Sequence, residues 1–120
     1  MKIYCFGKEH GKEITHYESN FIMSQVVEST QNIKISCMYL GNDGVIGYHQ
    51  AAIPQLLLIM QGRGYVRGGN KEYEDVKSGD AVFFNKGEWH ETKSITGMTA
   101  IVIEAEEMYP EKYMSMKKEE

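Results

Sequence analysis

Short apolar runs separated by turn residues dominate the chain. The runs are rich in β-branched and aromatic residues, which favour strands, and Gly, Asn, Asp and Ser gather between them. This pattern is typical of an all-β sandwich or barrel. It predicts strands at 21–27, 33–40, 55–60, 64–67, 81–84, 89–93 and 99–104 and turns at 41–44, 68–70, 77–80 and 96–97, with a hairpin over 65–73.

The strand expected at 55–60 is apolar on both of its faces. Side chains alternate between the two faces of a strand, and residues 56–60 are all apolar. A strand with water on one face would alternate apolar and polar residues instead. We therefore expect cover on both faces, and sheet packing between the two subunits of a homodimer would supply the outer cover.

The two ends of the chain differ from its centre. The first 20 residues are polar, and we expect an edge strand and a loop without catalytic residues. In the last segment, Tyr109, Tyr113 and Met116 have the spacing of a short amphipathic helix, and a frayed tail is the alternative. No linker or repeat interrupts the sequence, so we expect one domain over 1–120, with a barrel core at about 20–104 and a tail at 105–120.

Composition and charge narrow the function classes. Hydrophobic residues make up 42% and charged residues 25% of the 120 residues, as in ordinary globular proteins. The net charge of −4 and 13 scattered Lys and Arg residues argue against a nucleic-acid partner. No apolar run of about 18 residues and no signal-like N-terminus occurs, so we expect no membrane partner and a cytoplasmic location.

The two cysteines offer no recognisable chemistry. Cys5 and Cys37 belong to no C-x-x-C pair, so neither a zinc knuckle nor a redox motif is available. Cys37 lies within an apolar, strand-like run. We expect it to be a small buried hydrophobe.

Two histidines and a glutamine are the candidate metal ligands. A mononuclear metal site needs two or three imidazoles and an oxygen donor that converge from different strands, with a position left open for water or substrate. His49, Gln55 and His90 lie in separate segments of the predicted barrel, at 47–62 and 79–90. Gly62 closes the first segment.

The spacing of these residues resembles the two metal-site motifs of the cupin family. The first motif reads G-x5-H-x-H-x3 or 4-E-x6-G; here His49 matches its first histidine, Ala51 stands at the second and Gln55 at the glutamate. The second reads G-x5-P-x-G-x2-H-x3-N. The corresponding residues of this chain are Gly79, Asn85 in place of proline, Gly87, His90, and Ser94 in place of asparagine. The resemblance covers residues 33–104.

The resemblance implies a jelly-roll barrel, a double-stranded β-helix with a pocket at its mouth. A divalent metal there, Zn, Ni, Mn or Fe, would be held by His49, Gln55 and His90. Strand alternation adds the residues expected to line the pocket: Ala51, Leu57, Ile59, Glu88 and Thr92. Ala51 removes an imidazole and Gln55 removes a negative charge, which argues against strong metal binding.

Three functions remain open from the sequence. The first is a metal-dependent cupin enzyme of the oxygenase, isomerase or lyase type that acts on a small polar metabolite. The second is a non-catalytic cupin that binds or senses a small ligand without metal, and the third is a structural dimer with a packed barrel. The candidate general bases are Glu88 and a histidine released from ligation, and no nucleophile elbow, P-loop or dinucleotide motif occurs.

Overall fold

The computed structural model describes residues 1–28, 32–69 and 72–117, and nearly all of its elements are strands. Residue 70 of the expected turn at 68–70, residues 70 and 71 of the expected hairpin, and residues 118–120 of the expected tail lie outside the described residues. The strands are β1 (Lys2–Cys5), β2 (Lys12–Ile14), β3 (Phe21–Met23), β4 (Ile33–Leu40), β5 (Gly44–Gln50), β6 (Gln55–Arg67), β7 (Tyr73–Lys77), β8 (Asp80–Phe84), β9 (Trp89–Ser94), β10 (Met98–Ala105) and β11 (Ser115–Met116). Three short 3-10 turns complete the fold: η1 (Lys8–His10), η2 (His16–Glu18) and η3 (Pro110–Lys112).

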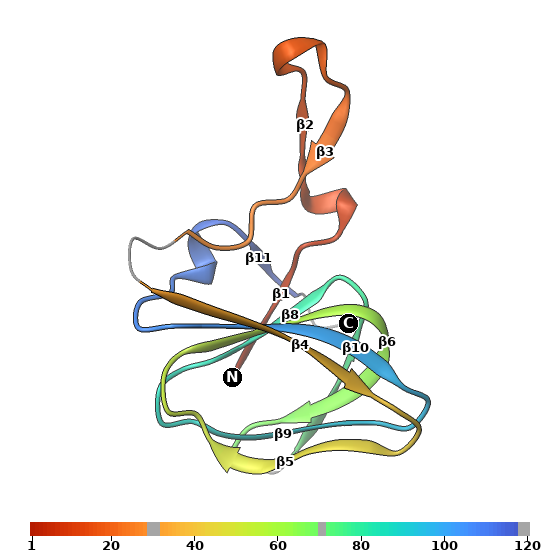
Figure 1. Ribbon diagram of the computed structural model, residues 1–120, viewed down its shortest axis with the longest axis vertical. Helices are drawn as coiled ribbons and strands as arrows, with labels where there is room; N and C mark the ends of the chain where they lie inside the picture. The colour runs from red at the N-terminus through yellow and green to blue at the C-terminus, as the bar shows by residue number, and fades with distance from the viewer. Residues whose placement is uncertain (29–31, 70–71, 118–120) are drawn as a thin grey trace.

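Two antiparallel layers form the barrel. The upper layer in Figure 1 has the strand order β11-β1-β8-β6-β10-β4, and the lower layer joins β7, the second half of β6, β9 and β5. Strand β6 serves both layers because it runs unbroken through Gly62, whose positive φ of 85° few other residues adopt. The all-β fold expected from the sequence is confirmed.

Apolar side chains form two clusters, one on each side of the upper layer. The lumen cluster lies between the layers and joins the upper strands to Val66 and Val76 of the lower one. The outer cluster lies on the opposite face of the upper layer. Their largest members from β6 are Leu57 and Ile59 in the lumen cluster and Leu56 and Leu58 in the outer cluster.

The expected burial of both faces of β6 is confirmed, but its outer cover comes from the same chain. Leu56 and Leu58 pack with Tyr4 from β1 and with Met108 and Met114 from the C-terminal segment. A second subunit is therefore not needed to cover this strand. The homodimer stays a prediction.

The C-terminal segment is not an amphipathic helix. It forms the turn η3 and then β11, which pairs with β1. Tyr109, Tyr113 and Met116, the expected apolar face, are exposed, and Met108 and Met114 are buried instead. Pro110 begins the single turn η3, and backbone pairing of β11 with β1 then favours an extended chain over a longer helix.

The N-terminal part departs most from expectation. Residues 2–5 are part of the main sheet, whereas 21–23 pair with β2 in a hairpin that projects from the barrel (Figure 1). The barrel core therefore does not begin at about residue 20. The expected strand at 21–27 ends at Met23, because residues 24–27 return to the barrel, where Val26 and Val27 pack against the outer cluster.

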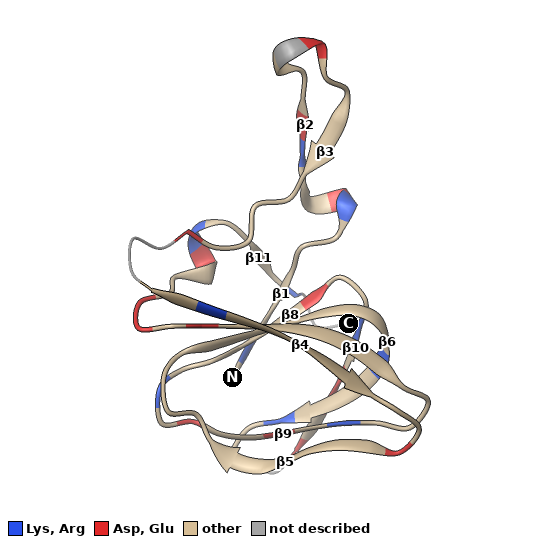
Figure 2. Ribbon diagram, in the orientation of Figure 1, with Lys and Arg blue, Asp and Glu red and all other residues tan. Residues whose placement is uncertain are grey.

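Strand β4 is exposed along most of its length. It matches the expected strand at 33–40, and it pairs only with β10 among the described strands. Cys37, expected to be buried, is exposed on the outer face of β4, where Ile35 and Tyr39 are exposed as well. Charges of both signs are interspersed over the barrel and the hairpin (Figure 2). Among the described residues, no helix has the length and apolar character needed to cross a bilayer.

Candidate functional site

His49 and His90 lie side by side on neighbouring strands. They are directly opposite each other in the pairing of β5 with β9, and their ring centroids are 4.3 Å apart at an interplanar angle of 54°. The fold therefore brings together two of the three residues that the motif spacing singled out, His49 and His90. His49 is exposed and His90 is only 4% exposed, so the pair extends from the surface into the barrel.

His90 has buried polar atoms without a partner. Neither Nδ1 nor Nε2 has a hydrogen-bond partner among the described residues, and its ring stacks on Phe84 at a centroid distance of 4.1 Å. Burial lowers the pKa of His90 to about 4, and the nearby His49 adds to this, although Glu88 acts in the opposite direction. At neutral pH the imidazole is uncharged, with one N–H donor and one acceptor nitrogen.

His49 is held by its own strand. Its Nδ1 lies 2.6 Å from the carbonyl oxygen of Gly47, which accepts a hydrogen bond when Nδ1 carries the proton. The neutral ring then has its lone pair on Nε2. This is the tautomer that accepts a hydrogen bond or binds a metal while a backbone carbonyl orients the ring.

Glu88 is engaged by two donors. Its carboxylate accepts hydrogen bonds from the N-terminal amine of Met1 and, at 2.8 Å, from the backbone N–H of Asn85. Burial raises the pKa of Glu88, but these two hydrogen bonds outweigh it and the pKa lies below its ordinary value. An ionised carboxylate that already accepts two hydrogen bonds is a weak general base.

Gln55 lies on the lumen face of β6, but its amide is bound elsewhere. Its Nε2 donates to Glu104 Oε1 at 3.0 Å, and Lys34 lies 3.9 Å from the other oxygen of that carboxylate. Gln55 is directly opposite Phe84, the residue whose ring stacks on His90. Its role as a third ligand stays a prediction, with Oε1 as the atom that would serve.

The residues expected to line the pocket are mostly packed inside the barrel. Ala51, Leu57 and Ile59 belong to the lumen cluster, and Thr92 is buried beside His90 on the same face of β9. Ala51, Leu57 and Ile59 are therefore part of the apolar interior of the barrel. That any of them contacts a ligand stays a prediction.

The donor set accommodates a metal ion only in part. Among the described residues, no group of three or more His, Cys, Asp and Glu side chains is arranged to hold an ion. The two imidazoles nevertheless offer Nε2 of His49 and a buried nitrogen of His90 without a partner. These residues fit two coordination positions, and Gln55 is the available oxygen donor.

The sequence did not reveal a second cluster on the outer face of β5 and β9. Arg67 donates to Glu91 at 3.0 Å and lies 4.3 Å from the ring centroid of Tyr48, which stacks on Trp89. The pKa of Glu91 is lowered mainly by the hydrogen bond from Tyr73 and then by the one from Arg67. Strand alternation places Tyr48, Trp89 and Glu91 on the face away from the histidines, but it does not identify Arg67 and Tyr73, which come from β6 and β7.

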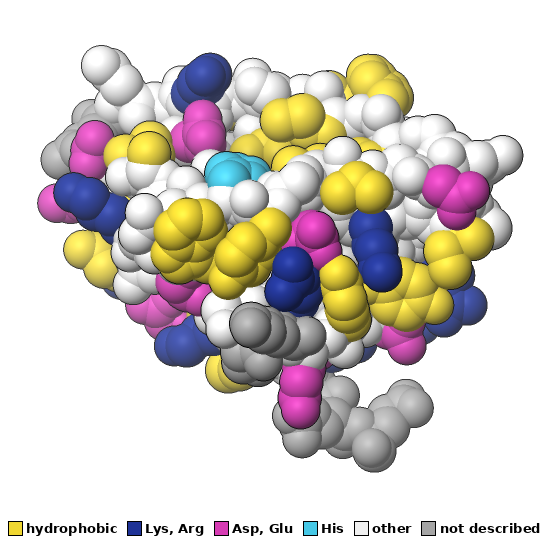
Figure 3. Space-filling model, turned by 90° about the horizontal axis from the view of Figure 1, so that it is seen from below, with side chains coloured by type: hydrophobic (Ala, Val, Ile, Leu, Met, Phe, Trp, Pro, Cys, Tyr) yellow, Lys and Arg dark blue, Asp and Glu magenta, His cyan; other side chains and the backbone are white. Residues whose placement is uncertain are grey.

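A surface hollow of about 530 Å³ lies beside this cluster. It is lined by Asp43, Gly44, Val45, Tyr65, Tyr73, Lys93, Ser94 and Ile95. Figure 3 shows apolar and cationic side chains interleaved on this side of the molecule, seen from below. The cations already have partners, since Lys93 lies 4.2 Å from the ring centroid of Tyr73 and Arg67 binds Glu91.

Comparisons with known proteins agree with the barrel. The model of the AraC-like ligand binding domain matches residues 34–107. No curated protein matches the chain. The matched region includes both His49 and His90.

Solved structures share the fold at low sequence identity. A cupin superfamily protein from Desulfitobacterium hafniense is 14% identical, with a TM-score of 0.59 over 71% of this chain and 77% of that one. A cupin-like protein from Thermotoga maritima is 18% identical, with a TM-score of 0.59 over 62% and 58%. A predicted oxalate decarboxylase from Thermotoga maritima is 21% identical, with a TM-score of 0.54; 57% of this chain covers 62% of its length, less than two thirds. These likenesses confirm the jelly-roll fold and do not extend to activity.

Proposed function

The chain belongs to the family of AraC-like ligand-binding domains with the cupin fold, and from this premise we propose that it binds a small polar molecule at His49 and His90. The observation that carries the proposal is the pair of buried nitrogens on His90 without partners. Each unpaired buried polar atom costs roughly 1–3 kcal/mol, and a ligand that hydrogen-bonds to them would recover part of this cost.

The charge state of the pair favours an uncharged ligand. His90 is neutral at physiological pH because its pKa is about 4, and it offers one donor and one acceptor. His49 adds an acceptor at Nε2. A hydroxyl or amide group, which both donates and accepts, matches this set better than an anion does, because an anion would need a cation or several donors.

Binding without turnover is the favoured form of this function. Catalysis on a bound metabolite would need a general base, and the nearby carboxylate of Glu88 is ionised and already accepts two hydrogen bonds. We therefore place the protein among binding or sensing cupins. It would act as a cytoplasmic homodimer, and the two unpaired thiols of Cys5 and Cys37 support a reducing compartment.

A divalent metal at the same place is the second candidate. His49 Nε2, one nitrogen of His90 and Gln55 Oε1 would hold the ion, and the hydrogen bond from His49 Nδ1 to Gly47 is the usual support of a metal-bound imidazole. A bound ion, Zn, Ni, Mn or Fe, would supply Lewis-acid chemistry. With a neutral amide in place of a carboxylate, we expect its affinity to be low.

A thermal-shift screen against uncharged and anionic metabolites tests the proposal. We expect an uncharged polar ligand to raise the melting temperature of the wild type and of His16→Ala, a matched control whose histidine is exposed and distant in sequence. The same ligand should not stabilise His49→Ala or His90→Leu. A ligand that stabilises all four proteins equally binds elsewhere and contradicts the proposed site.

Adding a chelator separates the two candidates. Stabilisation that persists in EDTA supports binding without metal. Stabilisation that disappears in EDTA, together with stoichiometric metal in the wild type and little in His49→Ala by elemental analysis, supports the metal site. Turnover of the ligand would contradict the non-catalytic form.

A further inference from the structure

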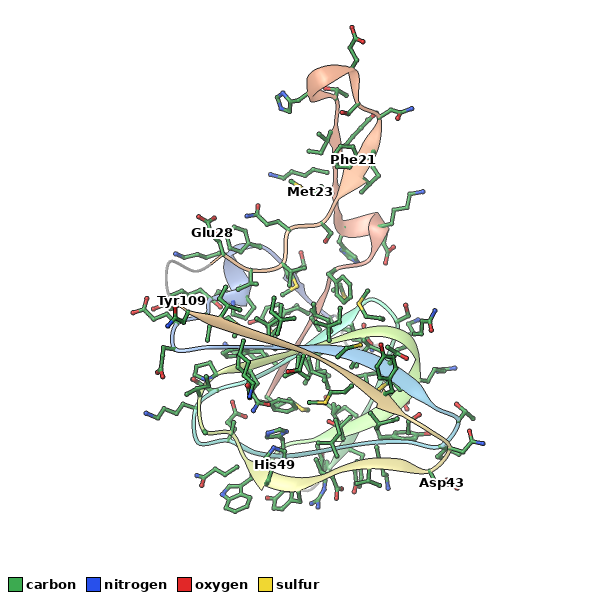
Figure 4. All side chains as sticks on the ribbon, in the orientation of Figure 1. Phe21, Met23, Glu28, Asp43, His49 and Tyr109 are labelled. Carbon is green, nitrogen blue, oxygen red and sulfur yellow. The ribbon has the colours of Figure 1, made fainter. Side chains whose placement is uncertain are left out.

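The surface hollow on the outer face of the lower layer is separate from the histidine pair. Val45 of β5, Lys93 of β9 and Tyr65 of β6 lie in one row across the sheet and line this hollow of about 530 Å³. A volume of this size is typical of pockets for small organic molecules. Figure 4 shows His49 near one end of β5 and Asp43, which lines the hollow, just before the other end.

The charged side chains on this face fall into two groups. Arg67 and Glu91 form an ion pair at 3.0 Å, so their charges compensate each other. Asp43 and Lys93, which line the hollow, form no ion pair with any residue that the structure describes. The contact of Lys93 is with the neutral ring of Tyr73, whose centroid lies 4.2 Å from the ammonium nitrogen. The hollow therefore lies on the half of the face where charge is left for a ligand.

The two uncompensated charges lie close together across neighbouring segments. The backbone N–H of Asp43 donates to the carbonyl oxygen of Ile95 at 3.0 Å, and Val45 is directly opposite Lys93. Asp43 and Lys93 are thus offset by two positions, a placement in which Cα atoms of neighbouring strands lie roughly 7–8 Å apart. A long side chain such as that of Lys93 reaches across this distance. One cation and one carboxylate therefore flank the same part of the hollow.

Apolar side chains provide most of the remaining lining. Val45 and Ile95 are each 58% exposed, and Tyr65 and Tyr73 line the hollow beside them. A ligand that covers such aliphatic side chains gains free energy from the hydrophobic effect. The hydroxyl of Ser94 already donates to a backbone carbonyl oxygen and accepts from a backbone N–H. Recognition of polar groups therefore depends mainly on the one cation and the one carboxylate.

We propose that this hollow binds an α-amino acid with a large apolar side chain. The carboxylate of the ligand pairs with Lys93, its ammonium group pairs with Asp43, and its side chain packs on Val45 and Ile95. An apolar amino acid matches the hollow because its two opposite charges and its apolar group are attached to one carbon. A simple anion or cation would leave one charge of the hollow uncompensated. The site goes beyond the proposed function and is independent of the histidine pair.

Nuclear magnetic resonance titrations of isotopically labelled protein with matched compounds test the proposal. Phenylalanine carries both charges, phenylpropanoate lacks the ammonium group, and phenylethylamine lacks the carboxylate. We expect phenylalanine to shift the amide resonances of Val45 and Lys93. Its dissociation constant should be about threefold to fivefold lower than that of either analogue, as one exposed ion pair contributes. Serine, which keeps both charges without a large apolar group, should bind more weakly than phenylalanine.

Variants assign each charge of the ligand to its partner. Lys93→Met should abolish the preference for phenylalanine over phenylethylamine, and Asp43→Asn should abolish the preference over phenylpropanoate. The controls are Lys12→Gln and Glu13→Gln, at exposed charges of β2, and both should keep the two preferences. His49→Ala should bind phenylalanine as the wild type does, so failure of the histidine site is distinguishable from failure of this one. The amide spectrum checks folding, and Lys93→Gln replaces Lys93→Met if that variant does not fold.

Three results would overturn the proposal. One is the absence of shifts around the hollow up to the solubility limit of phenylalanine. Another is equal binding of phenylalanine and its two analogues by the wild type. The third is a preference for phenylalanine that survives both Lys93→Met and Asp43→Asn. Weaker discrimination at high salt would support the proposal, because exposed charges are screened.

Discussion

Strands β6 and β4 belong to the same layer and are both rich in apolar residues, yet their environments differ. Residues 56–59 of β6 are buried on both faces, in the lumen cluster on one side and the outer cluster on the other. Strand β4 is exposed over most of its length. Only β10 separates the two strands in the sheet. Apolar patterning therefore shows that a face needs cover, and topology determines whether the same chain supplies it.

The cover of β6 comes from distant parts of the sequence. Tyr4 reaches it through the pairing of β1 with β8, and Met114 lies just before β11, which extends the same sheet. None of these segments extends over the outer face of β4. Burial of β6 therefore stabilises the single chain, whereas the exposed face of β4 is available for contact with another molecule.

The largest expected effect tests this difference directly. Ile59→Ala, in the fully buried half of β6, should lower the free energy of unfolding by about 4 kcal/mol, because it leaves a cavity in the lumen cluster. Ile35→Ala in β4 should change the unfolding of the monomer by less than about 0.5 kcal/mol. Urea denaturation at a protein concentration too low for dimers to form measures both changes in the free energy of unfolding. Equal losses would show that β4 is buried by its own chain.

Several strands were predictable because their apolar runs are bounded by turns. The run at 33–40 gives β4 residue for residue, and the run at 81–84 lies within β8. The projecting hairpin of β2 and β3 was not predictable, because the apolar run from Phe21 does not show that only its first three residues pair. The C-terminal segment was misjudged because Tyr109 and Tyr113 have helical spacing, whereas pairing of β11 with β1 depends on tertiary structure.

The candidate site, like the strands, was predictable only in part. Motif spacing predicted that His49 and His90 meet, and they are opposite each other in adjacent strands. It did not predict that Gln55 binds Glu104, a residue distant in the sequence. Strand alternation determines the face on which a side chain lies, and the register with neighbouring strands determines its partner.

Gly62 allows β6, unlike β4, to enter both layers. A Cβ there would lie 2.3 Å from the carbonyl oxygen of Gly97, and the φ of 85° is itself unfavourable for other residues. Gly62→Ala should therefore lower the free energy of unfolding by about 3 kcal/mol. Gly41→Ala is the control, since no described residue other than its chain neighbours lies within 4 Å of its added Cβ. Similar denaturation midpoints for the two variants would contradict this role for Gly62.

The smallest expected effect concerns the interior of the barrel and depends on pH. His90 has a pKa of about 4 in the folded protein against an ordinary value of 6.5, so the unfolded chain binds more protons between these values. The stability associated with a neutral His90 is complete above about pH 6.5 and falls as the pH decreases toward 4. We expect a loss of about 2 kcal/mol, less than the full shift implies, because solvent reaches the adjacent exposed His49. His90→Leu should remove this part of the pH dependence, whereas Ile35→Ala, on the outer face of β4, should retain it. Denaturation curves across this pH range measure the difference, and equal slopes for wild type and His90→Leu would show that His90 is not desolvated.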